Sequence, residues 1–192
     1  SIHMQKSYNE NSYINKVMQK AMEDNETNSN VHKFRTYYGN DETVFDAVGV
    51  EIPTVTLTRF PFEEYHTDLD TPENISENAL DKTNKILAEA INIFETNREA
   101  DNIKTGLYCL SNKKYNLYRS APEPGISEKG KSEYDKRWNL LMNCLQRDLK
   151  EKLSILDIAI KYQINYCEVA KYIEQWKSKK LINLEDINKG KL

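Results

Sequence analysis

Residues 39–71 carry the most informative pattern in the sequence and read GNDETVFDAVGVEIPTVTLTRFPFEEYHTDLDT. Within them, residues 53–59 are rich in β-branched side chains, which predicts a buried strand. A long loop follows the strand and carries His66. Because α/β folds place functional groups beyond the carboxyl ends of their strands, we expect this histidine to lie in a functional cleft.

Helical and strand patterns lie on both sides of this segment. A helix is predicted over residues 12–24, and a short strand over 31–35. A helical turn over 44–48 ends at Gly49. Further along, Ser76 caps a helix that runs to about residue 97. The apolar stripe of that helix is expected to contain Leu80, Leu87, Ala90, Ile91 and Phe94. This order of elements is typical of an α/β sheet layer.

The chain divides by composition into two parts. Residues 1–4 resemble the remnant of a tag and are expected to lie outside the fold. An α/β domain is predicted over 5–120, a linker over 121–133 and a small helical module over 134–192. Helical periodicity fades after residue 98, so the segment before the linker is read either as short strands or as a packed arm.

Three helical patterns follow the predicted linker. The first covers about 134–149. The second begins behind Ser154 and the third behind Asn165, each with an acidic residue three positions later, as in a capping box. Residues 181–184 could then form a wing strand. Two short capped helices joined by a tight turn predict a helix-turn-helix of the winged type.

The composition predicts a foldable, water-soluble chain. Of its 192 residues, 39% are hydrophobic and 30% are charged, and the net charge of −3 gives no overall basic field to attract nucleic acid. No apolar run approaches the roughly 18–20 residues that span a bilayer, so we expect no membrane partner. Three scattered cysteines, Cys109, Cys144 and Cys167, without a CxxC pair predict a reducing, cytoplasmic setting.

His66 is the candidate metal ligand. A neutral imidazole suits zinc, and one of the nearby carboxylates of Glu63, Glu64, Asp68 and Asp70 could fix its tautomer. The alternative is a loop histidine that merely stands among surface acids. The adjacent pair Glu63 and Glu64 is read as a solvated acidic loop.

The pattern Gly-x-Asp, followed by Gly-x-x-x-Pro, a strand and Tyr-His-Thr-x-x-Asp-Thr, resembles the closing motif of the di-zinc aminopeptidase superfamily. The likeness extends over about residues 7–184. It is similar in particular to bacterial aminopeptidase-like proteins with a C-terminal winged helix after a Gly-Leu-Tyr element, here residues 106–108. The implied fold is a partial aminopeptidase-like (phosphorylase/hydrolase-like) α/β sheet with helices, followed by a small winged-helix module.

The resemblance also implies roles for individual residues. It makes His66 the last zinc ligand, held in place by Thr67 and Asp70. Peptidases of the superfamily usually carry histidine directly after the Asp of the Gly-x-Asp loop, whereas Glu42 stands here. The implied substrate pocket is bordered by Asp41, Glu42 and Tyr65.

The remaining metal ligands of that superfamily precede the region that resembles this chain. A co-catalytic zinc site needs five or six protein ligands and a carboxylate base, and the sequence offers no further His-x-Asp or Glu-Glu element at the family's spacing. We therefore expect the C-terminal portion of a zinc-dependent protein that hydrolyses N-terminal peptide bonds, with a peptide or small-molecule substrate. A degenerate relative without catalysis is the alternative reading.

A non-catalytic binding module is the alternative from another functional class. Its winged helix would engage DNA or a protein partner, although the presumed recognition helix also carries Glu168 and Glu174. Self-association into a homo-oligomer through an open sheet edge is a third hypothesis. The candidate contact residues for nucleic acid or a partner are Lys171, Lys177, Lys179 and Lys180.

Overall fold

The structure is a computed structural model that describes residues 1–26, 28–101, 105–119 and 132–187. The chain forms two compact units, which divide between Glu95 and Thr96. The boundary between the two units therefore lies before the predicted linker. The predicted linker, 121–133, lies outside the described residues except for its last two positions.

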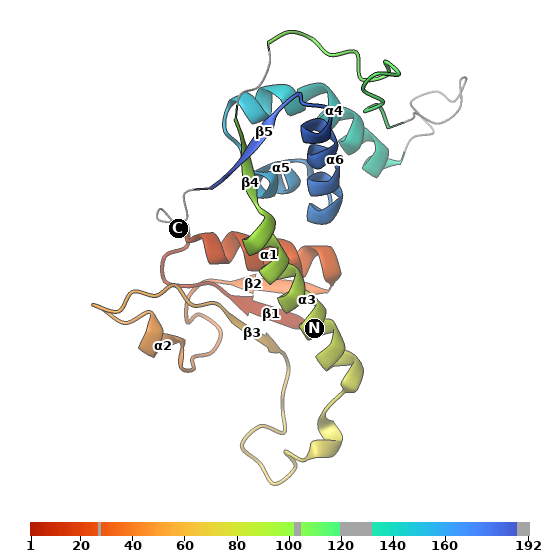
Figure 1. Cartoon of the computed structure of the whole chain (residues 1–192). Helices are drawn as coiled ribbons and strands as arrows, with labels where there is room; N and C mark the ends of the chain where they lie inside the picture. Colours follow the sequence, from red (N-terminus) through yellow and green to blue (C-terminus); the bar gives the residue numbers. More distant parts are fainter. Residues whose placement is uncertain (27, 102–104, 120–131, 188–192) are drawn as a thin grey trace. The chain divides into compact units, whose positions relative to one another are not determined.

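The first unit contains a three-stranded sheet of order β2-β1-β3 (Figure 1). The strands are β1 (Ile2–Gln5), β2 (Ser29–His32) and β3 (Thr56–Arg59). The central strand β1 is parallel to β2 and antiparallel to β3. Both predicted strands are therefore present, but each starts or ends a few residues away from its expected bounds, and β3 is a half-buried edge strand rather than a buried one.

The expectation that residues 1–4 lie outside the fold is wrong. Ile2 and Met4 are completely buried, and the strand that contains them pairs with both neighbours of the sheet. The physical reason is that this strand lies between β2 and β3, so both of its edges are paired, and both of its faces are buried, with Ile2 and Met4 on one face and His3 and Gln5 on the other.

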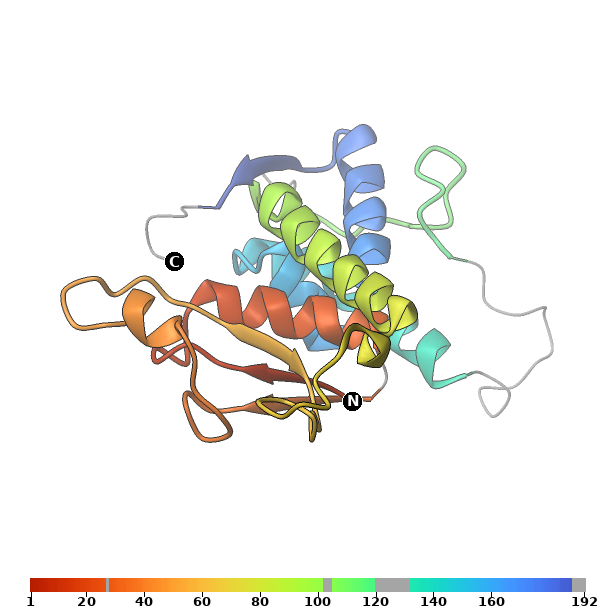
Figure 2. The same cartoon turned by 90° about the horizontal axis from the view of Figure 1, so that it is seen from below.

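The described part of the first unit also contains three helices. They are α1 (Tyr13–Asn25), the short α2 (Glu42–Phe45) and α3 (Glu77–Thr96), which follows the single 3-10 turn η1 (Pro72–Asn74). Figure 2 shows α3 beside α1, where the ring of Tyr13 meets that of Phe94 edge-on with centroids 5.0 Å apart. The buried apolar side chains of α1 and α3 are Tyr13, Val17, Met18, Ala21, Met22, Ile86, Ala90 and Ile93.

The orientation of α3 differs from the prediction. Of the five residues expected in its apolar stripe, only Ala90 is buried, and Leu80, Leu87 and Ile91 are exposed. The helix instead buries Ile86 and Ile93. Successive helical residues are 100° apart, so two neighbouring apolar rows exist on this helix, and packing selects the row that meets α1 and the sheet.

The second unit contains three helices and a two-stranded ribbon. The helices are α4 (Glu133–Lys150), α5 (Ile155–Tyr162) and α6 (Tyr166–Ser178). The strands β4 (Arg98–Asp101) and β5 (Asn183–Asp186) pair antiparallel. Mixed helices and small sheets place the whole chain in the α/β class.

Local capping explains where these helices begin. The Ser154 hydroxyl accepts the backbone N–H of Asp157 at 3.2 Å, and the Asp157 carboxylate accepts the N–H of Ser154 at 3.3 Å, which completes the predicted capping box. The Asn165 side chain accepts the N–H of Glu168 at 3.3 Å, but only this half of its predicted box forms. Between the two helices, Gln163 adopts the left-handed conformation that ends α5.

The predicted wing strand pairs with a segment from the other side of the predicted linker. Ala100 of β4 lies opposite Leu184 of β5. The segment after β4 forms no strand within residues 105–119 and is a packed arm, because the hydroxyl of Tyr172 donates to the carbonyl oxygen of Leu117 at 2.9 Å. In the described part of the chain, no helix is long and apolar enough to cross a membrane.

Candidate functional site

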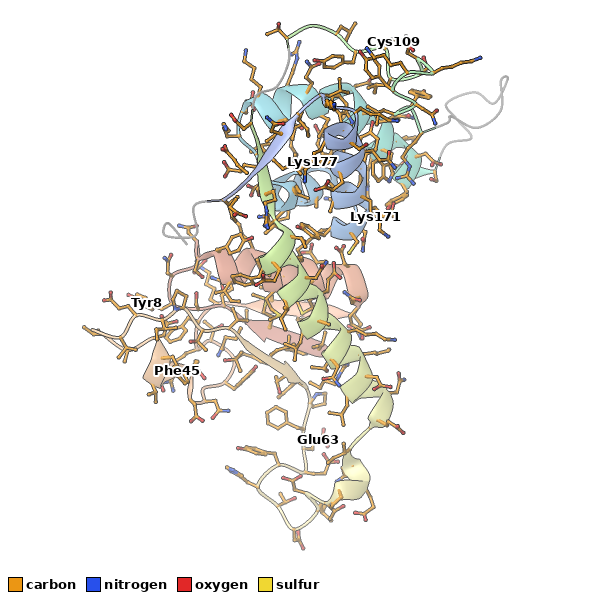
Figure 3. All side chains as sticks on the ribbon, viewed as in Figure 1. Tyr8, Phe45, Glu63, Cys109, Lys171 and Lys177 are labelled. Carbon is orange, nitrogen blue, oxygen red and sulfur yellow. The ribbon has the colours of Figure 1, made fainter. Side chains whose placement is uncertain are left out.

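The loop after β3 is built from consecutive hydrogen-bonded turns. The Tyr65 N–H donates to the carbonyl of Phe62 at 3.2 Å, and the Thr67 N–H donates to that of Glu64 at 3.0 Å. Glu63, labelled in Figure 3, belongs to the first of these turns. None of residues 60–71 is buried, so the shape of this loop rests on these local bonds rather than on a core.

His66 lies exposed near the tip of this loop. Its backbone φ of 64° is in the left-handed region, which is uncommon for a residue other than glycine. The imidazole stacks on the ring of Tyr65 with centroids 3.9 Å apart. Within the described residues, no hydrogen bond or ion pair engages either ring nitrogen, so both are available to a ligand.

Neither of the two residues expected to support His66 forms a hydrogen bond with its imidazole in the described structure. The Thr67 hydroxyl donates to the carbonyl of Glu64 and accepts the N–H of Leu69 at 3.2 Å, so it stabilises the turn. Asp70 is exposed, and its backbone N–H donates to the carbonyl of Thr67 at 3.2 Å. No group of three or more His, Cys, Asp or Glu side chains that could hold a metal ion exists within the described parts of the chain. The described residues alone therefore do not make a zinc site, and the role of His66 as a metal ligand stays a prediction.

A run of aromatic contacts connects the loop to the sheet. The ring of Phe60, at the end of β3, meets that of Phe62 with centroids 5.2 Å apart, and Phe62 meets Tyr65 at 5.3 Å. Phe60 in turn contacts His3 at 5.6 Å and Tyr37 at 4.8 Å. Ring contacts thus lead without a break from the central strand to His66 and connect this exposed loop to the sheet.

The predicted pocket residues lie on two different loops. Glu42 is buried, and its carboxylate oxygens accept the backbone N–H of Asn40 at 2.8 and 3.0 Å, which closes the Gly39–Glu42 loop. Burial, together with the charge of Glu42, raises the pKa of Tyr38 to about 12. Asp41 is exposed at the start of α2.

The structure does not bring the three pocket residues together by any direct contact. Tyr65 contacts Phe62 and His66, while Glu42 engages Asn40. A cleft of about 210 Å³ in the same unit is lined instead by Ser12, Tyr13, Ile14, Pro53 and Phe94. The assignment of Asp41, Glu42 and Tyr65 to a substrate pocket stays a prediction.

Sequence reasoning missed a histidine pair at the sheet. The Nδ1 atom of His3 lies 2.9 Å from the Nε2 atom of His32, and the ring of Tyr37 stacks on that of His32 at 4.1 Å. Strand alternation along residues 2–5 places His3 on the face opposite Ile2 and Met4, and both faces are buried, but reading residues 1–4 as a tag remnant hides this signal. All three histidines of the chain thus belong to one aromatic cluster.

The sequence model of a family described as "Domain of unknown function (DUF4910)" matches residues 1–97, which is half of the chain. The chain belongs to this family. The matched residues include β1, which agrees with its central place in the sheet. No curated protein matches the sequence.

A solved structure shares the fold of this DUF4910 protein. It is the crystal structure of a "putative peptidase" from Clostridium acetobutylicum, with a TM-score of 0.70 and 21% sequence identity. The match covers 96% of this chain and 39% of the Clostridium chain. The chain therefore corresponds to well under half the length of its structural neighbour, and at this identity the likeness establishes the fold alone.

The second unit holds a cleft of about 340 Å³ that includes one of the candidate lysines, Lys171. The Arg119 guanidinium covers the ring of Trp138 at 3.9 Å from its centroid and lies 3.3 Å from the Glu168 carboxylate. The cleft is lined by Arg119, Trp138, Glu168, Lys171, Tyr172 and Gln175. Its positive charge is partly neutralised by Glu168, which weakens it as a phosphate-binding surface.

The other candidate lysines follow along and beyond α6, where Figure 3 labels Lys171 and Lys177. Lys177 forms an ion pair of 3.2 Å with Glu174. Lys179 and Lys180 are exposed just after the helix and have no ion-pair partner among the described residues. The four lysines do not form one continuous basic surface on the described helix, and their role in binding nucleic acid or a partner stays a prediction.

Proposed function

We propose that this chain is the C-terminal portion of a zinc-dependent, aminopeptidase-like hydrolase. The observation that supports the proposal is His66, an imidazole without hydrogen-bond partners among the described residues, presented on a loop that aromatic contacts tie to the sheet. The fold shared with a Clostridium protein described as a peptidase agrees with it.

His66 would supply one ligand of the metal, and the other ligands would come from outside the described residues. A metal bound there would polarise the carbonyl of an N-terminal peptide bond. Asp70, four residues beyond His66, would orient the imidazole ring. The Thr67 hydroxyl would maintain the conformation of the loop through its bond to the carbonyl of Glu64.

The substrate would lie against Tyr65 and the Gly39–Glu42 loop. The buried Glu42 fixes that loop through the N–H of Asn40, and Asp41 next to it is exposed and free to meet a substrate amine. The second unit would be a winged-helix module, in which α5 and α6 form the helix-turn-helix and β5 the wing.

Zinc content tests the metal site. The complete reading frame that contains this sequence is purified with zinc, and the metal is measured by atomic emission in the wild type and in His66→Ala. We expect the variant to hold at least one zinc ion fewer per chain. Asp68→Asn serves as the control, because it removes a carboxylate from the same exposed loop without removing the proposed ligand.

Substrate specificity tests the reaction. Unblocked dipeptides and their N-acetylated forms are offered to the complete zinc-loaded protein, and we expect hydrolysis of the unblocked peptides only. Equal zinc content in the wild type and His66→Ala would refute the metal site. Failure to hydrolyse any unblocked peptide in a broad panel would refute the peptidase activity.

A further inference from the structure

Helix α3 has three faces rather than two. One face is buried within the first unit and includes Ile86, Ala90 and Ile93. A second face is polar throughout and consists of Asn78, Asp81, Lys82, Lys85, Glu89 and Asn92. Between them lies a third face with Leu80, Leu87 and Ile91, which are 54%, 41% and 64% exposed. One packing contact needs an apolar stripe of about 100°, and α3 presents about twice that width.

The third face has the spacing of a helix-packing seam. Leu80, Asn84, Leu87 and Ile91 are separated by four, three and four residues, which is the spacing of positions that meet a second helix. They extend over roughly 17 Å of the helix. Single exposed leucines are common on protein surfaces, but a continuous row on one helix is typical of a contact surface.

The charges beside the seam select the kind of helix that would fit. Glu77 and Asp81 lie along the edge of the seam that adjoins the polar face. Ala88 follows on the same edge, toward the C-terminal end of the helix. The lysines of α3 lie on the polar face, away from the seam. Two copies of α3 would bring these acids toward each other, whereas a helix with Lys or Arg beside its apolar row would pair with them.

The size of the seam favours a partner in the same polypeptide. Three partly exposed aliphatic side chains offer far less than the roughly 800 Å² per partner that a stable separate complex buries. A tethered helix needs less contact area, because the tether gives it an effective concentration of about millimolar. The structural neighbour, of which this chain covers 39%, is long enough to contain such a helix.

We propose that the seam formed by Leu80, Asn84, Leu87 and Ile91 receives an amphipathic α-helix with a basic flank, from the part of the same polypeptide that lies outside these 192 residues. This inference rests on the proposed function only in taking the chain to be a portion of a longer protein. It does not depend on zinc or on peptide hydrolysis.

Cysteine labelling tests the proposal. Ile91→Cys places a thiol on the seam, and Lys85→Cys places a matched thiol on the polar face of the same helix. Maleimide labelling is followed at each site by peptide mass spectrometry, which separates these sites from the exposed Cys109. We expect both to react at similar rates in the 192-residue chain. In the complete reading frame we expect position 91 to slow at least tenfold, with position 85 unchanged.

Three results would overturn the proposal. They are equal labelling of position 91 in the short and complete proteins, equal slowing at both positions, and slowing at position 91 in the short chain that grows with protein concentration. The last would make a second copy the occupant. None of these readouts involves zinc content or turnover, so a failure of the peptidase proposal is separately visible.

Discussion

The Nδ1 atom of His3 lies 2.9 Å from the Nε2 atom of His32, across the parallel pair of β1 and β2. A hydrogen bond between two imidazole nitrogens requires one of them to be unprotonated. Burial lowers the pKa of His3, and the charges of His32 and of the N-terminal ammonium lower it further. The folded sheet therefore disfavours the protonated form of His3.

This pair predicts a loss of stability in acid. In the unfolded chain His3 takes up its proton near pH 6.5, whereas in the folded chain it does so only at lower pH. The contribution of neutral His3 to the unfolding free energy is therefore complete above pH 6.5 and falls as the pH drops below it. Chemical denaturation at pH 7.5 and 5.5 should show a smaller pH effect in His3→Gln than in the wild type. The exposed His66→Gln is the control and should keep the wild-type difference. An unchanged pH effect in His3→Gln would contradict this account.

Asp148 is predicted to stabilise the second unit. It is buried, and its carboxylate accepts from Lys161 Nζ at 2.6 Å and from the Tyr162 hydroxyl. Asp148→Asn keeps the shape but removes the charge from both bonds, so we expect a loss of about 1.5–3 kcal/mol in unfolding free energy by urea titration. The exposed Glu151→Gln should change it by less than about 0.5 kcal/mol. Equal effects of the two variants would show that the Asp148 contacts do not stabilise the unit.

Two neighbouring residues of α3 test its orientation. Ile86 is completely buried, and Leu87 is partly exposed. Ile86→Ala should cost about 2–5 kcal/mol of unfolding free energy, because it leaves a cavity. Leu87→Ala should cost less than about 1 kcal/mol in the 192-residue chain. Thermal and urea unfolding of the two variants give the comparison, and a larger loss at position 87 would mean that the helix packs by its other apolar row.

The left-handed backbone at His66 predicts a gain in stability on substitution. Glycine adopts a φ of 64° without the steric cost that other residues meet. His66→Gly should therefore raise the unfolding free energy by up to about 1 kcal/mol, measured by urea titration. Thr67→Gly, where φ is not left-handed, should lower it. A clear loss of stability in His66→Gly would mean that the imidazole ring contributes contacts to the folded loop.

Helix positions were predictable because their signals are local. Ser132 and Ser154 each bond to the residue three positions on, and the acid there bonds back, so a few consecutive residues determine where α4 and α5 begin. The predicted bounds of α1 and α3 likewise fall within one or two residues of the observed ones. Capping and periodicity need no information from distant parts of the chain.

The histidine cluster could not be predicted because its members come from three separate segments. His3, His32 and His66 are spread over the first third of the chain, and only the pairing of β1 with β2 and β3 connects them through Phe60. A sequence pattern can indicate that His66 lies on a loop. It contains no information about which rings that loop meets.

The sequence alone determined the α/β class, the positions of the helices and their caps, and the loop that carries His66. Tertiary structure alone decided that residues 2–5 are the central strand, which row of α3 is buried, and that β5 pairs with β4 across some 80 residues. The physical reason is that caps and periodicity act over a few residues. Strand partners and buried faces are instead chosen by the total apolar surface that the folded chain removes from water.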